Sequence, residues 1–215
     1  MSTETLSLAP IELRVLGTLL EKQRTVPETY PLSLNALMAG CNQKTSRNPV
    51  MDVTERDLLP ALEQLKELGL VHEVSGSRVV RFAHQFEKVI GVPSQSAALL
   101  TVLMLRGPQT AGELRLNSER LHKFADISSV EAFLAELASR PQGPLVRELP
   151  RQPGSRENRW MHLLGDALEE SAVSSVLEGK AENDLAARVS QLEAEVSELR
   201  GLLQEMLTWR DRLEN

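Results

Sequence analysis

The sequence has little of several residue types, and each shortage excludes a class of protein. Its 215 residues include one cysteine, Cys41, so neither an intrachain disulfide nor a cysteine-based zinc site can form. Aromatic residues make up only 3%, so the core must be built from Leu, Val, Ala and Met. No apolar run approaches the roughly 18 residues of a membrane span, and no signal-peptide pattern opens the chain. We therefore expect a cytoplasmic protein that makes no membrane contact.

Common catalytic motifs are absent as well. The sequence has no phosphate-cradling glycine motif, no G-x-S-x-G, no H-E-x-x-H and no pair of carboxylates beside a histidine. We therefore expect no enzyme activity, no catalytic residues, no cofactor and no metal site. Cys41 follows an apolar helix, and we predict a small buried side chain there rather than a nucleophile.

The net charge of −6 is unevenly distributed. Residues 1–90 carry 10 basic and 11 acidic side chains, residues 91–165 carry 9 and 7, and residues 166–215 carry 5 and 12. The acidity therefore lies in the tail, and the rest of the chain is close to neutral. Only a local basic patch, rather than a bulk field, could attract nucleic acid to such a chain.

A nine-residue pattern occurs twice, at 76–84 and 154–162, with the form G-S-R-x-x-R-aromatic-x-H. A Gly-Ser turn followed by a short run with an aromatic residue predicts a hairpin tip and its return strand. Alternation along the strand turns each aromatic residue inward and the arginine before it outward. We interpret the closing residues, His84 and His162, as structural hydrogen-bonding residues rather than metal ligands.

Helical patterns precede each hairpin. Their starts are marked by capping boxes, in which an N-cap side chain and a residue three positions later bond to each other's backbone. The predicted pairs are Thr54 with Asp57, Thr110 with Glu113, and Ser128 with Glu131. The first repeat is also predicted to contain a short helix over Leu32–Ala39, and Pro60 predicts a kink or a third helix that starts nearer Leu58.

Three helices followed by a two-stranded hairpin is the element order of a winged helix-turn-helix. The sequence therefore predicts a mostly α protein with small β-hairpins (α+β), made of two tandem winged helix-turn-helix domains plus a C-terminal helical coiled-coil segment. We place the first domain at 1–88 and the second at 89–165. An acidic linker follows at 166–184, and the coiled-coil helix occupies 185–215.

The C-terminal segment has a heptad pattern. β-Branched residues at a and leucine at d favour a parallel two-stranded coil, and the charges at e and g would be opposite across a homodimer. The residues predicted to form the dimer are Leu185, Val189, Leu192, Val196, Leu199, Leu203 and Met206. The alternative is a single amphipathic helix that folds back on its own domains.

A winged helix offers DNA its third helix, the turn before that helix, and the wing. Both third helices here are acidic, which counts against the simplest mode of binding. The turn at 42–47 and the wings carry the basic residues, which can hold phosphates or enter a groove. The predicted DNA-binding residues are Asn42, Gln43, Lys44, Thr45, Ser46, Arg47, Arg78, Arg81, Arg151, Arg156 and Arg159.

Each of these features also has a structural interpretation, since a basic wing can be a solvated hairpin and 42–47 can be a structured loop. The leading hypothesis is a DNA-binding protein, a transcriptional regulator, with double-stranded DNA and a second copy of the chain as partners. The alternative is a protein–protein interaction adaptor that uses winged-helix domains as a scaffold and binds no nucleic acid.

Five runs in the chain, at 14–17, 30–37, 41–47, 76–80 and 105–110, resemble the YceH-type family of uncharacterised bacterial proteins. The resemblance covers about residues 6–164. It implies tandem winged-helix domains, a bacterial source and no established biochemical activity, and it brings no catalytic residues. Pro60 departs from the helix formers expected there.

Overall fold

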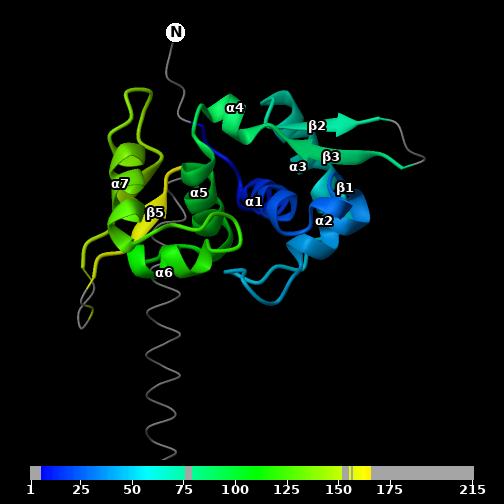
Figure 1. The fold of residues 1–215 in the computed structure, drawn as a ribbon. Coiled ribbons are helices and arrows are strands. Elements are labelled where there is room, and N and C mark those ends of the chain that lie inside the picture. The colour runs from blue at the N-terminus through cyan, green and yellow to red at the C-terminus, as the bar shows by residue number, and fades with distance from the viewer. Residues whose placement is uncertain (1–5, 76–78, 152–154, 156, 166–215) are drawn as a thin grey trace, which may run out of the picture. The chain divides into compact units, whose positions relative to one another are not determined.

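Figure 1 shows the computed structural model of the chain, which describes residues 6–75, 79–151, 155 and 157–165. All of these residues lie in one compact unit, Met1–Asp166. The predicted linker at 166–184 and the predicted coiled coil at 185–215 lie outside the described residues, as do Arg78 and Arg156.

The first repeat combines helices with a three-stranded antiparallel sheet whose middle strand is β3. Its elements are α1 (Pro10–Thr25), η1 (Pro27–Thr29), β1 (Leu32–Ser33), α2 (Leu34–Cys41), α3 (Glu55–Glu67), β2 (Val71–Val74) and β3 (Arg81–His84). The helix predicted over Leu32–Ala39 begins two residues later, because Leu32 pairs with Phe82 in the sheet. Ser33 then caps α2 by accepting the Ala36 N–H at 3.3 Å.

The second repeat follows the same order. After α4 (Phe86–Ile90), which connects the repeats, its elements are α5 (Ser94–Arg106), α6 (Ala111–Asn117), α7 (Ile127–Ala138), β4 (Val146–Glu148) and β5 (Trp160–His162). Gln109 pairs with Trp160 just before the N-cap Thr110, as Leu32 pairs with Phe82 just before the N-cap Ser33. The prediction of a mostly α protein with small antiparallel hairpins is confirmed in the described residues.

Two of the three predicted capping boxes are confirmed, those of Thr54 with Asp57 and Thr110 with Glu113. The third prediction is wrong. α7 begins after Asp126, whose carboxylate accepts the Ser129 N–H at 2.7 Å. An aspartate is as good an N-cap as a serine, and here it starts the helix two residues earlier than the predicted cap at Ser128.

Of the two alternatives predicted for Pro60, the start nearer Leu58 is wrong, because the helix begins at Glu55 and continues through Pro60. The kink stays a prediction. A proline here removes the hydrogen bond to the Arg56 carbonyl, at a cost of about 3 kcal/mol. Both residues are exposed, so water can reach that carbonyl. Leu58, Leu62 and Leu65, each no more than 1% exposed, bury enough apolar surface on the opposite face to offset this cost.

The two repeats share one hydrophobic core, in which α1 lies beside α5 (Figure 1). Gly17 permits this approach, because a Cβ at that position would lie 2.9 Å from Leu105 Cδ2. The segment before α1 also pairs with the segment after β5, through a 2.8 Å hydrogen bond from Leu8 N–H to the Leu164 carbonyl. The two repeats therefore pack as one unit. The predicted domain boundary between residues 88 and 89 stays a prediction.

The prediction that His84 and His162 are structural is confirmed. The His84 Nδ1 accepts the Phe86 N–H at 3.4 Å, and the His162 Nδ1 accepts the Leu164 N–H at 3.3 Å. Each ring thus bonds to the backbone two residues further on, immediately after its hairpin. The repeated sequence pattern therefore includes a repeated hydrogen bond.

Candidate functional site

Two buried arginines hold the turn at 42–47 against α1. Arg14, 1% exposed, donates from Nη1 to the Cys41 carbonyl at 3.1 Å. Arg47, 6% exposed, donates to both carboxylate oxygens of Glu21 at 3.1 and 2.7 Å and from Nε to the Gly40 carbonyl at 3.2 Å. The sequence places Arg47 among the DNA-binding residues, whereas the structure turns its guanidinium inward onto α1 and α2.

Asn42 is also engaged inside the protein. Its Nδ2 donates to the Val53 carbonyl at 2.8 Å, and its Oδ1 accepts the Val53 N–H at 2.7 Å. The amide thereby closes the loop between α2 and α3 and is not presented to a base edge. For Asn42 and Arg47 the structured-loop interpretation describes what the structure shows.

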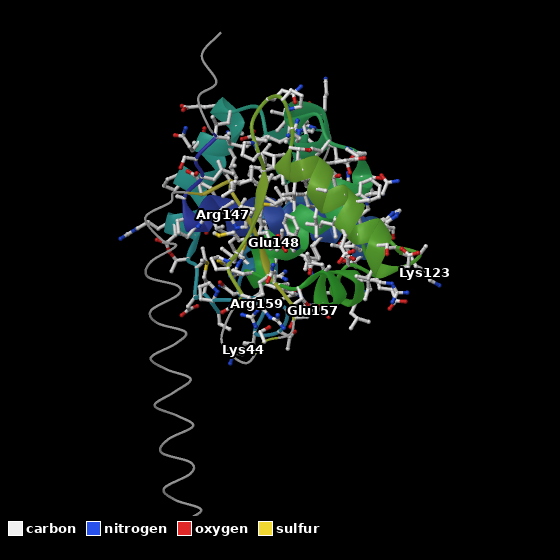
Figure 2. The ribbon with its side chains drawn as sticks, turned by 90° about the vertical axis from the view of Figure 1, so that its left-hand side faces the viewer. Lys44, Lys123, Arg147, Glu148, Glu157 and Arg159 are labelled. Carbon is white, nitrogen blue, oxygen red and sulfur yellow. The ribbon has the colours of Figure 1, made fainter. Side chains whose placement is uncertain are left out.

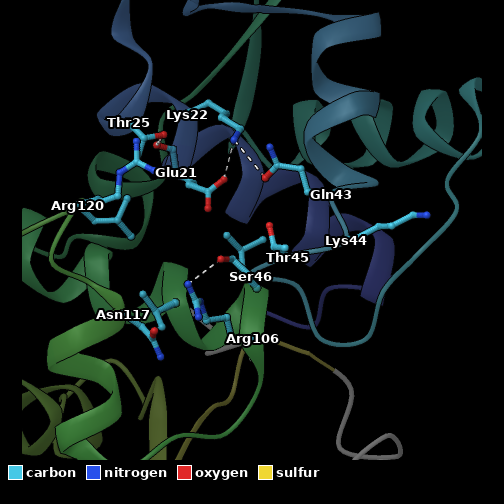
Figure 3. A pocket seen from close by; sticks show the side chains of 13 residues that line it. Glu21, Lys22, Thr25, Gln43, Lys44, Thr45, Ser46, Arg106, Asn117 and Arg120 are labelled. Atoms are coloured by element: carbon cyan, nitrogen blue, oxygen red, sulfur yellow. Dashed lines mark hydrogen bonds and ion pairs between the residues drawn. The ribbon is translucent and has the colours of Figure 1, made fainter.

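The other four predicted residues of this turn, Gln43, Lys44, Thr45 and Ser46, line a pocket of about 410 Å³ (Figure 3). Lys44 and Thr45 are exposed, and neither has a hydrogen-bond or ion-pair partner among the described residues. Ser46 accepts a 2.8 Å hydrogen bond from Arg106 Nη2 on α5. We name this cavity the inter-repeat pocket, because α5 and the turn belong to different repeats.

The opposite wall of the inter-repeat pocket is formed by the turn that follows α6. Asn117, Arg120 and Leu121 contribute to it. This turn is the equivalent of 42–47, since α2 ends at Cys41 and α6 ends at Asn117. Lys44 and Arg120 each lie three residues beyond those helix ends, so the two repeats bring equivalent basic residues to one pocket.

The lining of the inter-repeat pocket is positively charged. Its basic residues are Lys22, Lys44, Arg106 and Arg120, and its one acidic residue is Glu21. Burial would raise the pKa of the Glu21 carboxyl, but the hydrogen bonds and charge of Arg47 and the charge of Lys22 outweigh burial and bring the pKa below its usual value. Glu21 therefore stays ionised with its charge offset, and the pocket can attract an anion.

The wing arginines differ in whether their guanidinium groups are already hydrogen-bonded within the protein. Arg81 donates to the Pro31 carbonyl at 2.7 Å and the Thr29 carbonyl at 3.2 Å, which ties the return strand to the loop before α2. Arg151 donates from Nε to the Ser155 carbonyl at 2.7 Å. Arg159 is partly exposed and has no side-chain partner within the described residues.

The second wing carries both signs of charge. Figure 2 labels Arg147 and Arg159 on this hairpin, with the carboxylates of Glu148 and Glu157 among them. Asn158 Nδ2 donates to Glu148 Oε1 at 2.9 Å. The second wing is therefore less basic than its arginines alone suggest.

The described residues contain neither a cluster of metal-binding side chains nor a membrane-spanning helix. Across these ranges, no three His, Cys, Asp or Glu side chains gather closely enough to hold a metal ion. Within the same part of the chain, no helix has both the length and the apolar character needed to cross a bilayer.

Together, the fold and the site define a class: an α-rich protein of two related helix–hairpin repeats with a basic pocket where their equivalent turns meet. The family model "Protein of unknown function, DUF480" matches residues 8–155. The chain is 66% identical over 209 residues to a UPF0502 protein of Dechloromonas aromatica (strain RCB), covering 95% of this chain and 98% of that protein. It is 59% identical over 207 residues to a UPF0502 protein of Burkholderia cenocepacia (strain HI2424), covering 93% and 87%. The chain therefore belongs to the DUF480, or UPF0502, family of bacterial proteins, which confirms the family resemblance predicted from the sequence.

Proposed function

We propose that residues 1–88 and 89–165 are two tandem winged helix-turn-helix domains and that the protein binds double-stranded DNA as a transcriptional regulator. The element order supports the fold proposal, because each repeat has three helices followed by a hairpin. A third strand position, at β1 or Gln109, completes each small sheet. Helix-turn-helix domains of this order are a recurring DNA-binding motif, and the proposal is of a binding protein rather than an enzyme.

One observation carries the DNA-binding proposal: Lys44 and Arg120 occupy equivalent turns, and both are exposed. Neither has a hydrogen-bond or ion-pair partner among the described residues, so each can give its full charge to a phosphate. Phosphate contacts from Arg159 would add to those of Lys44 and Arg120. Arg78 and Arg156, two wing residues outside the described ranges, would add further contacts.

Replacing both Lys44 and Arg120 with alanine should weaken binding to mixed-sequence duplex DNA on the order of tenfold at about 50 mM salt. The slope of log K against log salt should fall by about 2, because each basic residue that neutralises a phosphate releases about one counterion. Fluorescence anisotropy of a labelled duplex measures both quantities on the full chain.

The matched control is Lys88→Ala with Arg56→Ala, which removes two exposed charges from α4 and α3. This pair should leave affinity and salt slope close to wild type. If the wild-type chain shows no binding at about 50 mM salt, the DNA proposal fails. If the two double variants behave alike, the turns are not the contact.

The acidic surface of α3 favours the second candidate function, a protein–protein adaptor. Glu55, Glu63 and Glu67 are exposed on this helix. Lys66, on the same helix, is held by Glu63 and Glu73 at 2.7 Å each and offers little free charge. A helix of this kind would repel a DNA groove, so absence of DNA binding in the same anisotropy experiment would favour the adaptor.

We also propose that residues 185–215 form a parallel coiled coil that makes the protein a homodimer. Leu192→Glu with Leu199→Glu should convert the full chain to a monomer in sedimentation equilibrium, because both substitutions put charge at d positions of the coil. The control, Ser190→Glu with Ser197→Glu, adds the same charge at outward b positions and should leave the dimer intact. A dimeric d-position variant would contradict the coil.

A further inference from the structure

The inter-repeat pocket has the size of a small-molecule site. Its volume is about 410 Å³, within the range of ligand pockets in proteins, about 300–1,000 Å³, and far too small for a duplex. Val102, Leu105 and Leu121 give it apolar surface beside its charged groups. The cavity can therefore take a compact molecule that has both a charged and an apolar part.

The polar groups of the pocket are mostly hydrogen-bond donors. Lys22 Nζ donates to Gln43 Oε1 at 3.3 Å and pairs with Glu21 at 3.2 Å, which leaves the Gln43 amide N–H groups for another acceptor. The Ser46 hydroxyl accepts from Arg106, so its own proton can be donated elsewhere. The two oxygens of Glu21, the one carboxylate in the lining, already accept from Arg47 and Lys22.

The floor of the pocket is already arranged without a ligand. Ser46 has a left-handed backbone (φ 61°), which is costly for a residue with a side chain. Arg47 donates to the Ser46 carbonyl at 2.9 Å and Arg106 to its hydroxyl at 2.8 Å, so contacts from both repeats hold that conformation. Asn48 N–H also donates to the Leu105 carbonyl at 2.8 Å, which fixes the turn against the end of α5. A ligand would therefore meet a preorganised site.

We infer that the inter-repeat pocket binds a small phosphate-bearing molecule, held by Arg106 and Ser46 on its floor and by Arg120 on the turn after α6. A phosphate group matches this lining because it carries more than one negative charge and accepts several hydrogen bonds at once. Arginine forks suit phosphate oxygens in particular. Burial also lowers the pKa of the Arg106 guanidinium, with the charge of Arg47 adding to the effect, so an anion there would stabilise its charged form.

A ligand in this pocket would join the two repeats at the turns proposed to contact DNA. It would use the charge of Arg120, so the bound ligand and a DNA phosphate would compete for the same guanidinium. The binding site itself does not depend on the DNA proposal, because all of its groups are present in the free protein. The two proposals can therefore fail separately.

The test is isothermal titration of the full-length chain with sodium pyrophosphate, without DNA and at constant ionic strength. We expect one site per chain with Kd below about 1 mM. Arg120→Met, which replaces an exposed residue and should not disturb the fold, is expected to raise Kd at least tenfold. Arg106→Met should do the same, and Lys88→Met on α4 should leave Kd unchanged.

In a second titration, pyrophosphate is added to the protein–duplex complex. This experiment tests whether pyrophosphate and the DNA backbone bind to the same residues. Release of duplex at pyrophosphate concentrations near its Kd shows that both use the same groups. The pocket proposal is overturned if no pyrophosphate binds at about 5 mM, or if Arg120→Met and Arg106→Met bind as tightly as the Lys88→Met control. Failure of the duplex to bind would leave the titration of the free protein, and hence the pocket proposal, standing.

Discussion

Replacing Arg47 with methionine should lower the free energy of unfolding by about 3–5 kcal/mol, the range for breaking a buried ion pair from one side. The side chain of Arg47 is fully buried, and that of Glu21 is 17% exposed. Without the guanidinium, the Glu21 carboxylate keeps only Lys22 as a partner. The Gly40 carbonyl, which accepts from both Nε and Nη2 of Arg47, loses these bonds as well.

The measurement is urea denaturation of the full chain, with midpoints compared at constant slope. The control is Arg24→Met, because Arg24 forms an ion pair with Glu87 at 3.0 Å, but their side chains are 43% and 35% exposed. Exposed pairs contribute about 0–1 kcal/mol. A loss of less than about 1 kcal/mol for Arg47→Met would mean that the Arg47–Glu21 ion pair contributes no more to stability than an exposed pair does, despite its burial.

A double-mutant cycle identifies the partner. Glu21→Gln alone leaves the buried Arg47 charge without its carboxylate, and the double variant removes both charges. The double variant should therefore be more stable than the sum of the two single losses predicts. Additive losses would show that Arg47 acts through the Gly40 and Ser46 carbonyls alone.

The repeat and most of the helices were predictable from the sequence because their signals are local. Capping boxes, apolar periodicity and the Gly-Ser turns involve residues within a few positions of one another. The N-cap of α7 shows the limit of such reasoning. Asp126 and Ser128 are both good caps, and only the packing of the whole helix selects between them.

The roles of Arg47 and Asn42 could not be predicted, because their partners lie far away in the sequence. Arg47 bonds to Glu21, 26 residues earlier, and Asn42 bonds to Val53, 11 residues later. In sequence, a polar turn with two positive charges looks the same whether its side chains point inward or outward. Only tertiary packing decides that Arg47 points inward and Lys44 outward.

The second wall of the inter-repeat pocket carried a signal that sequence reasoning missed. The nonapeptide repeat relates the hairpins at 76–84 and 154–162 and, at the same spacing, pairs Lys44 with His122; counting from the ends of α2 and α6 pairs Lys44 with Arg120. The repeat alone would therefore have pointed to the turn after α6 but not to Arg120. That the two turns meet at one pocket still required the packing of α1 against α5.

Lowering the pH from 6.5 to 4 should remove about 3 kcal/mol of stability through His84 alone. Burial lowers the pKa of this imidazole from its usual 6.5 to about 4, with Glu87 opposing the shift and Arg24 and His72 adding to it. The geometry explains why the ring stays neutral. Nδ1 faces the Phe86 N–H and must accept, so the one ring proton lies on Nε2 and is donated to Gln23 Oε1 at 2.9 Å.

The direction of the pH effect follows from the two pKa values. Between pH 6.5 and 4 the unfolded chain binds a proton at His84 and the folded chain does not, so acid favours unfolding. The stabilisation is complete above pH 6.5 and is lost as the pH falls toward 4. Burial lowers the pKa of His162 to about 4 as well, but His162 is more exposed than His84, so the free-energy expectation rests on His84.

Urea midpoints at pH 7, 6 and 5 test this expectation before most carboxylates begin to titrate. His84→Gln is the informative variant, because glutamine can hydrogen-bond but cannot gain a proton. It should be less stable than wild type at pH 7 and lose less stability than wild type between pH 7 and 5. His122→Gln, which replaces a partly exposed histidine on the turn after α6, should keep the wild-type pH dependence. If His84→Gln and wild type lose stability in parallel, the pKa of the His84 imidazole is the same in the folded and unfolded chain, and burial does not keep the ring neutral.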